Sequence, residues 1–176
     1  LLTAVASHVT STRYSHADGM STDGTREILD RLRQEHDNVR YVDSPTGRTP
    51  NGLNLAIHAS RGDVIVRCDG HAELPPDYVR TAATVMEETG AVNVGGIQHA
   101  VGLRPMQRAI AYAMSSRIGV GDARFHYGGE AGPADTVYLG VFQREALFSA
   151  GLFDEKELVC LIGTVGQYSV TCLTTS

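Results

Sequence analysis

Short apolar runs typical of strands alternate with amphipathic runs typical of helices between about Asp18 and Glu155. This alternation constrains the fold more than any other feature, because it is typical of α/β domains in which helices cover a sheet. The expected helices begin at Thr25, Thr49–Pro50, Pro75–Pro76, Arg104 and Arg144, and the expected strands cover residues 39–42, 64–66, 92–97 and 136–142. We therefore expect an α/β domain.

The two ends of the chain depart from this pattern. Residues 1–16 give no clean strand ahead of Asp18, and no charged residue follows Glu157. We expect an atypical N-terminal segment at 1–16, a core at 17–155 and a divergent, uncharged tail at 156–176, with the fold incomplete at both ends. The tail is too rich in Thr, Ser and Gly for a membrane span, which needs about 20 mostly apolar residues. The N-terminus also lacks the charged region of a signal peptide.

Composition excludes some classes of function. The 176 residues suffice for one domain with its own core, and the formal net charge is -5. A net negative charge without a cluster of basic residues argues against a nucleic-acid-binding protein. Cys68, Cys160 and Cys172 match neither a zinc ribbon nor a CxxC redox motif, so we expect reduced thiols in a cytoplasmic protein.

Asp69-Gly70-His71 is the first candidate site, because it directly follows the buried apolar run at 64–66. Ligands of open α/β sheets bind beyond the carboxyl ends of the strands. Asp69 and His71 can turn toward one cation, and a carboxylate with an imidazole suits Mn²⁺ or a similar divalent ion, whereas Mg²⁺ prefers oxygen ligands. The alternative interpretation is a turn with a surface histidine.

Three other segments could also carry chemistry. Residues 18–25 combine acidic side chains and glycines at a helix entry, which suits a ribose and a phosphate, although these residues alone favour a tight turn with an N-cap at Thr22 or Asp23. Arg48, ahead of the next helix, could clamp a phosphate or lie in a solvated loop. The glycine-rich loop 119–133 fits neither GxGxxG nor GxxxxGK[ST], and is either an acceptor lid or a surface loop.

Taken in order, these segments resemble the family 2 glycosyltransferases, most closely the succinoglycan-biosynthesis type. The resemblance spans residues 17–155 and rests on ADGMSTDGTREIL at 17–29, PNGLNLAI at 50–57, RGDVIVRCDGHAELPPDYV at 61–79, NVGG at 93–96, AMSSRIGVGDARFHYGGEAGPADTVYLGVFQRE at 113–145 and GLFDE at 151–155. It implies the GT-A fold, a Rossmann-like, mixed and mostly parallel sheet flanked by helices.

The resemblance also implies an activity, which is transfer of a sugar, with inversion, from a nucleoside-diphosphate donor such as a UDP-sugar. The acceptor would be a polysaccharide or a lipid-linked glycan. A divalent cation, Mn²⁺ or Mg²⁺, would neutralise the departing diphosphate. We expect a cytoplasmic protein that associates peripherally with the inner face of the cell membrane.

Site residues follow from the same resemblance. The donor site would comprise Asp18 at the nucleoside, Asp23 in support of that loop, and Arg48, Asn54 and Asp69, with Asp69 at the diphosphate. The cation would be bound by Asp69 and His71, the first and last positions of a DxD-type motif. Gly95, Gly96 and Asp135 would lie on the acceptor side.

The chain departs from the family pattern at two places. The P-x-[YFL]-N-E-like segment that normally ends the first strand is missing from residues 1–16, and the acidic cluster that normally follows GLFDE is missing after Glu155. The catalytic base therefore stays unassigned. The alternative hypothesis is a degenerate glycosyltransferase that binds nucleotide without turnover. A sugar nucleotidyltransferase is disfavoured because the chain has no GxGTR-like loop near its start.

Overall fold

The structure is a computed structural model that describes residues 2–8, 11–70, 72–97, 99–114, 132–133, 137–156 and 169–170. Its strands are β1 (Leu2–His8), β2 (Ser11–Asp18), β3 (Val39–Asp43), β4 (Val64–Asp69), β5 (Asn93–Gly96), β6 (Tyr138–Gln143) and β7 (Ser169–Val170). Its helices are α1 (Thr25–Glu35), α2 (Thr49–Ala59), α3 (Tyr78–Thr89), α4 (Pro105–Met114) and α6 (Arg144–Ser149). The predicted α/β class is confirmed.

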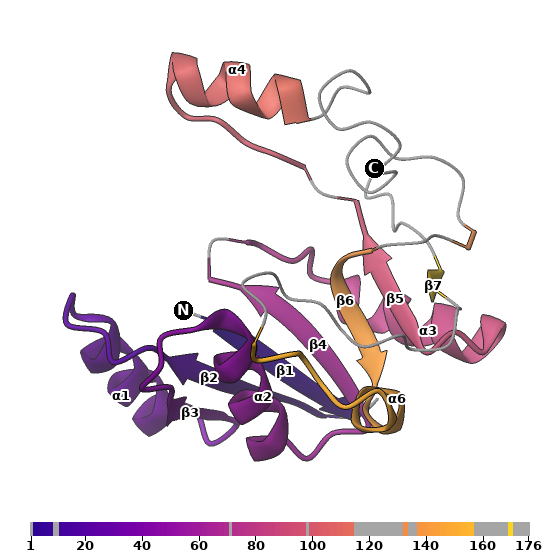
Figure 1. The fold of residues 1–176 in the computed structure, drawn as a ribbon, viewed down its shortest axis with the longest axis horizontal. Coiled ribbons are helices and arrows are strands. Elements are labelled where there is room, and N and C mark those ends of the chain that lie inside the picture. Colours follow the sequence, from indigo (N-terminus) through magenta and orange to yellow (C-terminus); the bar gives the residue numbers. More distant parts are fainter. Residues whose placement is uncertain are drawn as a thin grey trace.

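One mixed sheet forms the centre of the domain, with the strand order β3-β2-β1-β4-β6-β5-β7 (Figure 1). The pairs β2/β3 and β5/β7 are parallel, and the other four neighbouring pairs are antiparallel. It follows that β1 and β6 run one way and the other described strands run the opposite way. The described sheet is therefore mixed, as expected, but its neighbouring pairs are mostly antiparallel and not mostly parallel, because β1 and β6 are inserted in the reverse direction. The carboxyl ends of β2, β3 and β4 therefore lie at one edge of the sheet.

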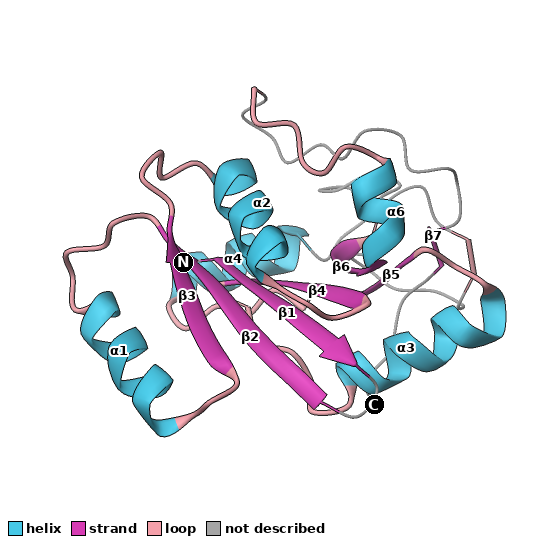
Figure 2. Ribbon diagram, turned by 90° about the horizontal axis from the view of Figure 1, so that it is seen from below, coloured by secondary structure: helices cyan, strands magenta, loops and turns pink. Residues whose placement is uncertain are grey.

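Helices cover both faces of this sheet (Figure 2). On one face, α2 and α6 pack over β4 and β6 through a cluster of Leu53, Ile57, Ile65, Phe142, Leu147 and Phe153. On the other face, α3 packs over β4, β5 and β6 through Val66, Tyr78, Ala82, Met86, Ala91, Val94 and Val141. Ile65 and Val66 are adjacent in β4 and enter opposite clusters, as the two-residue period of a strand requires.

The expectation of no clean strand within residues 1–16 was wrong, because β1 and most of β2 lie there. In β2 the buried positions are occupied by Ser15 and Ala17, which are 1% and 3% exposed, while Tyr14, whose side chain projects from the opposite face of the strand, is 39% exposed. Small and polar side chains at the buried positions remove the apolar alternation by which a strand is predicted. Pairing with β1 and β3 stabilises β2 instead.

Helix ends differ from the predictions by a few residues. The N-cap of α1 is Gly24, in the left-handed region with φ 87°, and neither Thr22 nor Asp23. The N-cap of α2 is Arg48, and α2 ends at Ala59, with Ser60 as its C-cap. Gly90, with φ 70°, is the C-cap of α3, and its N–H donates a hydrogen bond to the carbonyl of Met86.

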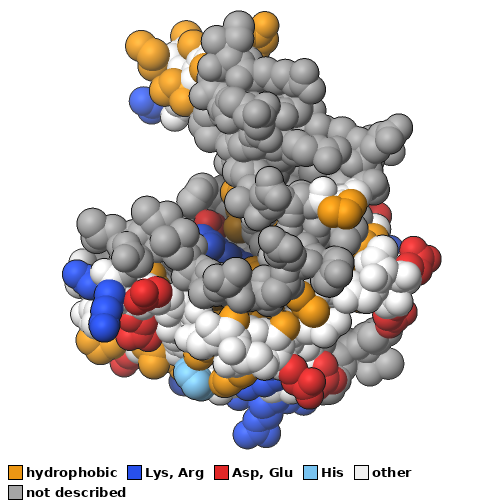
Figure 3. Space-filling view, turned by 45° about the vertical axis from the view of Figure 1, so that its right-hand side comes forward, with side chains coloured by type: hydrophobic (Ala, Val, Ile, Leu, Met, Phe, Trp, Pro, Cys, Tyr) orange, Lys and Arg blue, Asp and Glu red, His pale blue; other side chains and the backbone are white. Residues whose placement is uncertain are grey.

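The helix α4 stands apart from the sheet (Figure 1). Its side chains Met106, Ile110 and Tyr112 are 73%, 53% and 81% exposed. Figure 3 shows hydrophobic side chains gathered at this end of the molecule beside a basic one. Within the described part of the chain, no helix is both long and apolar enough to cross a membrane.

Candidate donor-binding pocket

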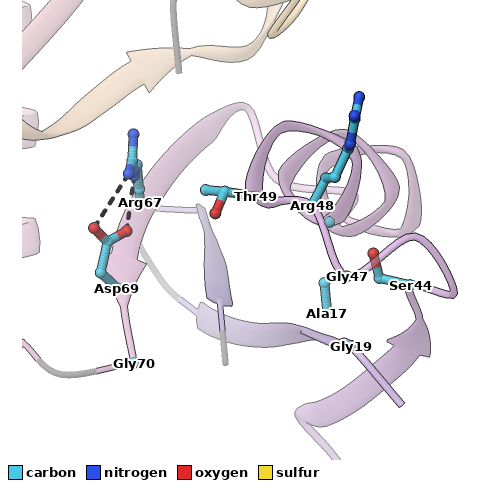
Figure 4. A pocket seen from close by; sticks show the side chains of 10 residues that line it. Ala17, Gly19, Ser44, Gly47, Arg48, Thr49, Arg67, Asp69 and Gly70 are labelled. Carbon is cyan, nitrogen blue, oxygen red and sulfur yellow. Dashed lines mark hydrogen bonds and ion pairs between the residues drawn. The ribbon is translucent and has the colours of Figure 1, made fainter. Parts of the chain in front are cut away.

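A pocket of about 310 Å³ opens at the edge of the sheet where β2 and β4 end and α2 begins. Its lining residues are Ala17, Gly19, Ser44, Gly47, Arg48, Thr49, Gly52, Arg67, Asp69 and Gly70 (Figure 4). These residues come from three separate segments of the chain, 17–19, 44–52 and 67–70, which the sheet topology brings together. Ala17 and Asp69 lie at the same level because both pair with Leu2 of β1.

The N-terminus of α2 forms one wall of the pocket. Thr49 and Gly52 in its first turn line the cavity, together with Arg48 at the N-cap. The unpaired N–H groups of a first helical turn carry a partial positive charge and attract anions. In Figure 4 the side chains of Arg48 and Arg67 flank Thr49 and extend in the same direction. This wall therefore suits a phosphate group.

A buried carboxylate, that of Asp18, holds the loop after β2 in place. Asp18 is 0% exposed, and its Oδ2 accepts a hydrogen bond from the N–H of Ser21 at 3.1 Å. Arg26 of α1 lies 2.9 Å from the same oxygen and also forms an ion pair with Asp43 at the end of β3. Asp18 does not line the pocket, although the next residue, Gly19, does. Its predicted contact with a nucleoside stays a prediction, and its contacts in the structure position the loop.

Asp23 stabilises the start of α1. Its Oδ1 accepts hydrogen bonds from the hydroxyl and the N–H of Thr25, at 2.7 Å and 3.2 Å. These hydrogen bonds lower the pKa of Asp23 below its usual value. The side chain does not line the pocket. The structure shows Asp23 holding the start of α1, and its predicted support of the donor loop stays a prediction.

Asp69 lies in the pocket at the end of β4 and is bound by an arginine that the sequence interpretation missed. Arg67 Nε lies 2.8 Å from Asp69 Oδ1, and Arg67 Nη2 lies 3.1 Å from Oδ2. Residues 67 and 69 are two apart in a strand, so their side chains project from the same face. A charged residue two positions before the aspartate, at the end of an apolar run, was the feature of the sequence that could have predicted this ion pair.

Two neutral groups lie near this ion pair. Burial raises the pKa of the Cys68 thiol, and the charge of Asp69 raises it further. Burial also raises the pKa of Tyr138 in β6, with a further contribution from Asp69. Both groups therefore keep their protons at neutral pH. Cys68 forms no disulfide with a described residue, and Cys160 and Cys172 lie outside the described residues.

Asn54 lies on α2 but away from the pocket. The side chain is 7% exposed; its Nδ2 donates to the carbonyl of Phe153 and to Glu155 Oε1, both at 2.9 Å. Its Oδ1 accepts from the N–H of Phe153 at 3.0 Å. Glu155 Oε2 also accepts from Asn51 Nδ2 at 2.5 Å. The structure thus gives Asn54 a role in fastening residues 153–155 to α2, and the predicted donor contact stays a prediction.

The Asn54→Ala variant is expected to lose about 2 kcal/mol of stability, because it leaves the buried backbone groups of Phe153 without their partner. Chemical unfolding followed by circular dichroism measures this loss. The affinity of the folded variant for UDP, measured at low temperature, should change by less than about threefold. A loss of 1.4 kcal/mol of binding free energy would lower this affinity about tenfold. A tenfold loss of UDP affinity with unchanged stability would place the side chain in the donor site instead.

Gly95 and Gly96 end β5 and are buried against their neighbours. A Cβ atom at Gly95 would lie 2.4 Å from the Cβ of Val137, and one at Gly96 would lie 2.9 Å from Cε2 of Tyr78. Neither residue lines the pocket. Close packing of β5 against β6 and α3 therefore requires glycine at both positions. Their predicted acceptor-side role stays a prediction, and Asp135 lies outside the described residues.

The predicted cation site can be assessed only in part, because His71 also lies outside the described residues. Among the residues that the structure describes, no group of three His, Cys, Asp or Glu side chains is close enough to hold a metal ion. Asp69 is the acidic residue that lines the pocket. Mg²⁺ is commonly held by one or two carboxylates together with substrate phosphates and water. Asp69 therefore fits a cation that arrives with a diphosphate.

The fold and the pocket define an α/β domain that can bind an anionic ligand at the carboxyl edge of its sheet. The chain belongs to glycosyl transferase family 2, whose model matches residues 16–148. Over 142 residues it is 33% identical to the succinoglycan biosynthesis protein ExoA of Rhizobium meliloti (strain 1021). That match covers 80% of this chain and 43% of that protein.

Solved structures share the fold at low sequence identity. The crystal structure of S. aureus TarS 1-349 in complex with UDP has a TM-score of 0.56 at 14% identity, and the match covers 81% of this chain and 40% of that one. Mannosyltransferase PcManGT from Pyrobaculum calidifontis, in complex with GDP-Man and Mn2+, has a TM-score of 0.53 at 20% identity, with coverage of 80% and 37%. The predicted GT-A fold is confirmed, and the chain spans less than half the length of these relatives.

Proposed function

We propose that this chain binds a nucleoside-diphosphate sugar, with UDP as the nucleotide, and transfers the sugar to a glycan acceptor with inversion. The observation that carries the proposal is the pocket at the carboxyl edge of the sheet, where Arg48, Arg67 and the N-terminus of α2 meet Asp69. Two guanidinium groups and a helix N-terminus suit a diphosphate. The family membership and the UDP and GDP-Man complexes of the structural relatives support this ligand class.

The chain's own residues would act mainly on the leaving group. Arg48 and the first turn of α2 would bind phosphate oxygens and hold the donor against the sheet. Asp69 would hold the cation, Mn²⁺ or Mg²⁺, which neutralises charge on the departing diphosphate when it is bound. The loop at Gly19, fixed by Asp18 and Arg26, would pack against the nucleoside. An acceptor hydroxyl would attack the anomeric carbon from the opposite side and lose its proton to a base.

Binding without turnover is the second candidate, and one observation favours it. Among the described residues that line the pocket, Asp69 is the only acid, and it is paired with Arg67. An acceptor hydroxyl therefore has no described carboxylate in the pocket to take its proton.

Release of UDP from UDP-sugars, measured with the whole chain and Mn²⁺ or Mg²⁺, separates the two candidates. Cation-dependent release above the rate without protein supports transfer. UDP binding without release supports the second candidate, and absence of UDP binding contradicts both.

We also propose that the protein works at the cytoplasmic face of the cell membrane on a polysaccharide or lipid-linked acceptor. The exposed apolar side chains of α4, Met106 and Ile110 among them, support peripheral attachment. Replacing both by serine should reduce co-sedimentation with anionic phospholipid vesicles by about fivefold, as expected when two exposed anchors are lost. Equal co-sedimentation of the variant and the parent chain would refute this attachment.

A further inference from the structure

The bidentate ion pair between Arg67 and Asp69 occupies both oxygen atoms of the carboxylate that is proposed to bind the cation. The two contacts measure 2.8 Å and 3.1 Å. The pair is also shielded from water, since the two side chains are 22% and 17% exposed. In this arrangement the guanidinium lies where a cation would approach Asp69.

Electrostatics make this arrangement unfavourable for a cation that arrives alone. A divalent ion at Asp69 would lie within a few ångströms of the guanidinium, and like charges repel more strongly in a partly buried site than in water. The ion must therefore displace Arg67 from Asp69 or bind beside it at a cost.

A diphosphate removes this conflict, because it offers Arg67 another anionic partner in the same pocket. Planar guanidinium groups bind phosphate oxygens in the same two-point manner as carboxylates. Arg48 and Arg67 contribute two positive charges to the described pocket lining and Asp69 one negative charge, so the lining carries an excess of positive charge. The ring of Phe153, 6.0 Å from Arg67 Cζ, supports the guanidinium on one side.

We propose that Arg67 couples cation binding to donor binding: it holds Asp69 in the empty pocket and moves to the diphosphate when donor and cation bind together. This inference rests on the proposed function, since it assumes that a nucleoside diphosphate is the ligand. Arg67 would make the empty pocket a poor cation site and the donor complex a good one. It is thus both a donor-binding residue and the determinant of cooperativity between cation and donor.

The test uses the whole chain and two probes, Mn²⁺ alone and UDP in saturating Mn²⁺. Electron paramagnetic resonance of free Mn²⁺ measures the affinity for the cation, and calorimetry measures the affinity for UDP. Arg67→Gln should bind Mn²⁺ alone about fivefold more tightly, because the competing ion pair is lost. It should bind UDP in Mn²⁺ at least about tenfold more weakly, because a charge-assisted contact is lost. Arg80→Gln, an equal charge change at an exposed position of α3, should alter neither affinity.

The opposite directions of the two effects distinguish coupling from simple loss of a ligand or of the fold. Arg67→Lys keeps the charge but not the two-point geometry, so its Mn²⁺ affinity should fall between those of the parent chain and Arg67→Gln. Unchanged or weaker Mn²⁺ binding by folded Arg67→Gln, or by folded Arg67→Lys if Arg67→Gln does not fold, would overturn the inference. If the parent chain binds UDP and Arg67→Gln binds it equally well, the inference also fails while the proposed function stands. If the parent chain binds no UDP, both fail.

Discussion

Replacing Asp69 by alanine is expected to lower cation-dependent turnover of a UDP-sugar by at least about 100-fold, in line with the loss of a group that stabilises a departing diphosphate. Asp69 is the acidic residue of the described pocket lining. Without it, the cation that accompanies the diphosphate has no described protein ligand. The measurement is the initial rate of UDP release at saturating donor, with the Mn²⁺ concentration varied.

The matched controls for this variant are Asp37→Ala and Asp69→Asn. Asp37 is exposed in the turn between α1 and β3, so its loss should leave the rate unchanged. Asp69→Asn keeps the shape but not the charge, and should lose nearly as much turnover as alanine. If the parent chain proves to bind without turnover, Mn²⁺-dependent UDP affinity is the measured quantity instead. Retention of more than half the rate or affinity in Asp69→Ala would remove this residue from the cation site.

Arg26→Leu is expected to destabilise the fold by about 3 kcal/mol, because it leaves a buried carboxylate without its cation. Asp18 is 0% exposed, and Arg26 is the basic side chain 2.9 Å from it. Arg26 also joins the ends of β2 and β3 through Asp43. Equilibrium unfolding in urea gives the loss as a shift of the midpoint. UDP affinity of the folded variant should also fall, since the loop at Gly19 loses its support.

The control for Arg26 is Arg33→Leu on the same helix. Arg33 pairs with Asp30 at 3.7 Å, and the two side chains are 57% and 47% exposed. A pair exposed to this degree contributes less than about 1 kcal/mol. Combining Arg26→Leu with Asp18→Asn should recover part of the lost stability, because the buried charge is then also removed. Equal effects of the Arg26 and Arg33 variants would contradict the assigned role of the Asp18–Arg26 pair.

Much of the core could be predicted from the sequence, because helix periodicity and apolar strands are local signals. Leu53 and Ile57 of α2, four positions apart and so on one face of the helix, lie in the core. The strand β2 could not be predicted in this way, because Ser15 and Ala17 occupy its buried positions. Its stability depends on pairing with β1 and β3, which local patterns do not reveal.

The candidate site could be predicted only as far as its location along the chain. Asp69 and Arg48 line one pocket, as their positions after a strand and before a helix suggested. The partners of these residues depend on tertiary contacts. Asn54 and Phe153 are 99 positions apart in the sequence, so the hydrogen bond between them could not be inferred from residues 50–57 alone. Likewise, the pairing of Arg67 with Asp69 depends on side-chain geometry that a motif does not specify.

The central claim is that a nucleoside diphosphate binds at the carboxyl edge of the sheet, between the ends of β2 and β4 and the start of α2. Hydrogen–deuterium exchange of the whole chain, with and without UDP and Mn²⁺, tests it most directly because it locates protection along the sequence. Slower exchange is expected in peptides that contain residues 17–19, 44–52 and 67–70, with α3 unchanged. Protection confined to α3 or α4, or no protection at saturating UDP, would contradict the claim.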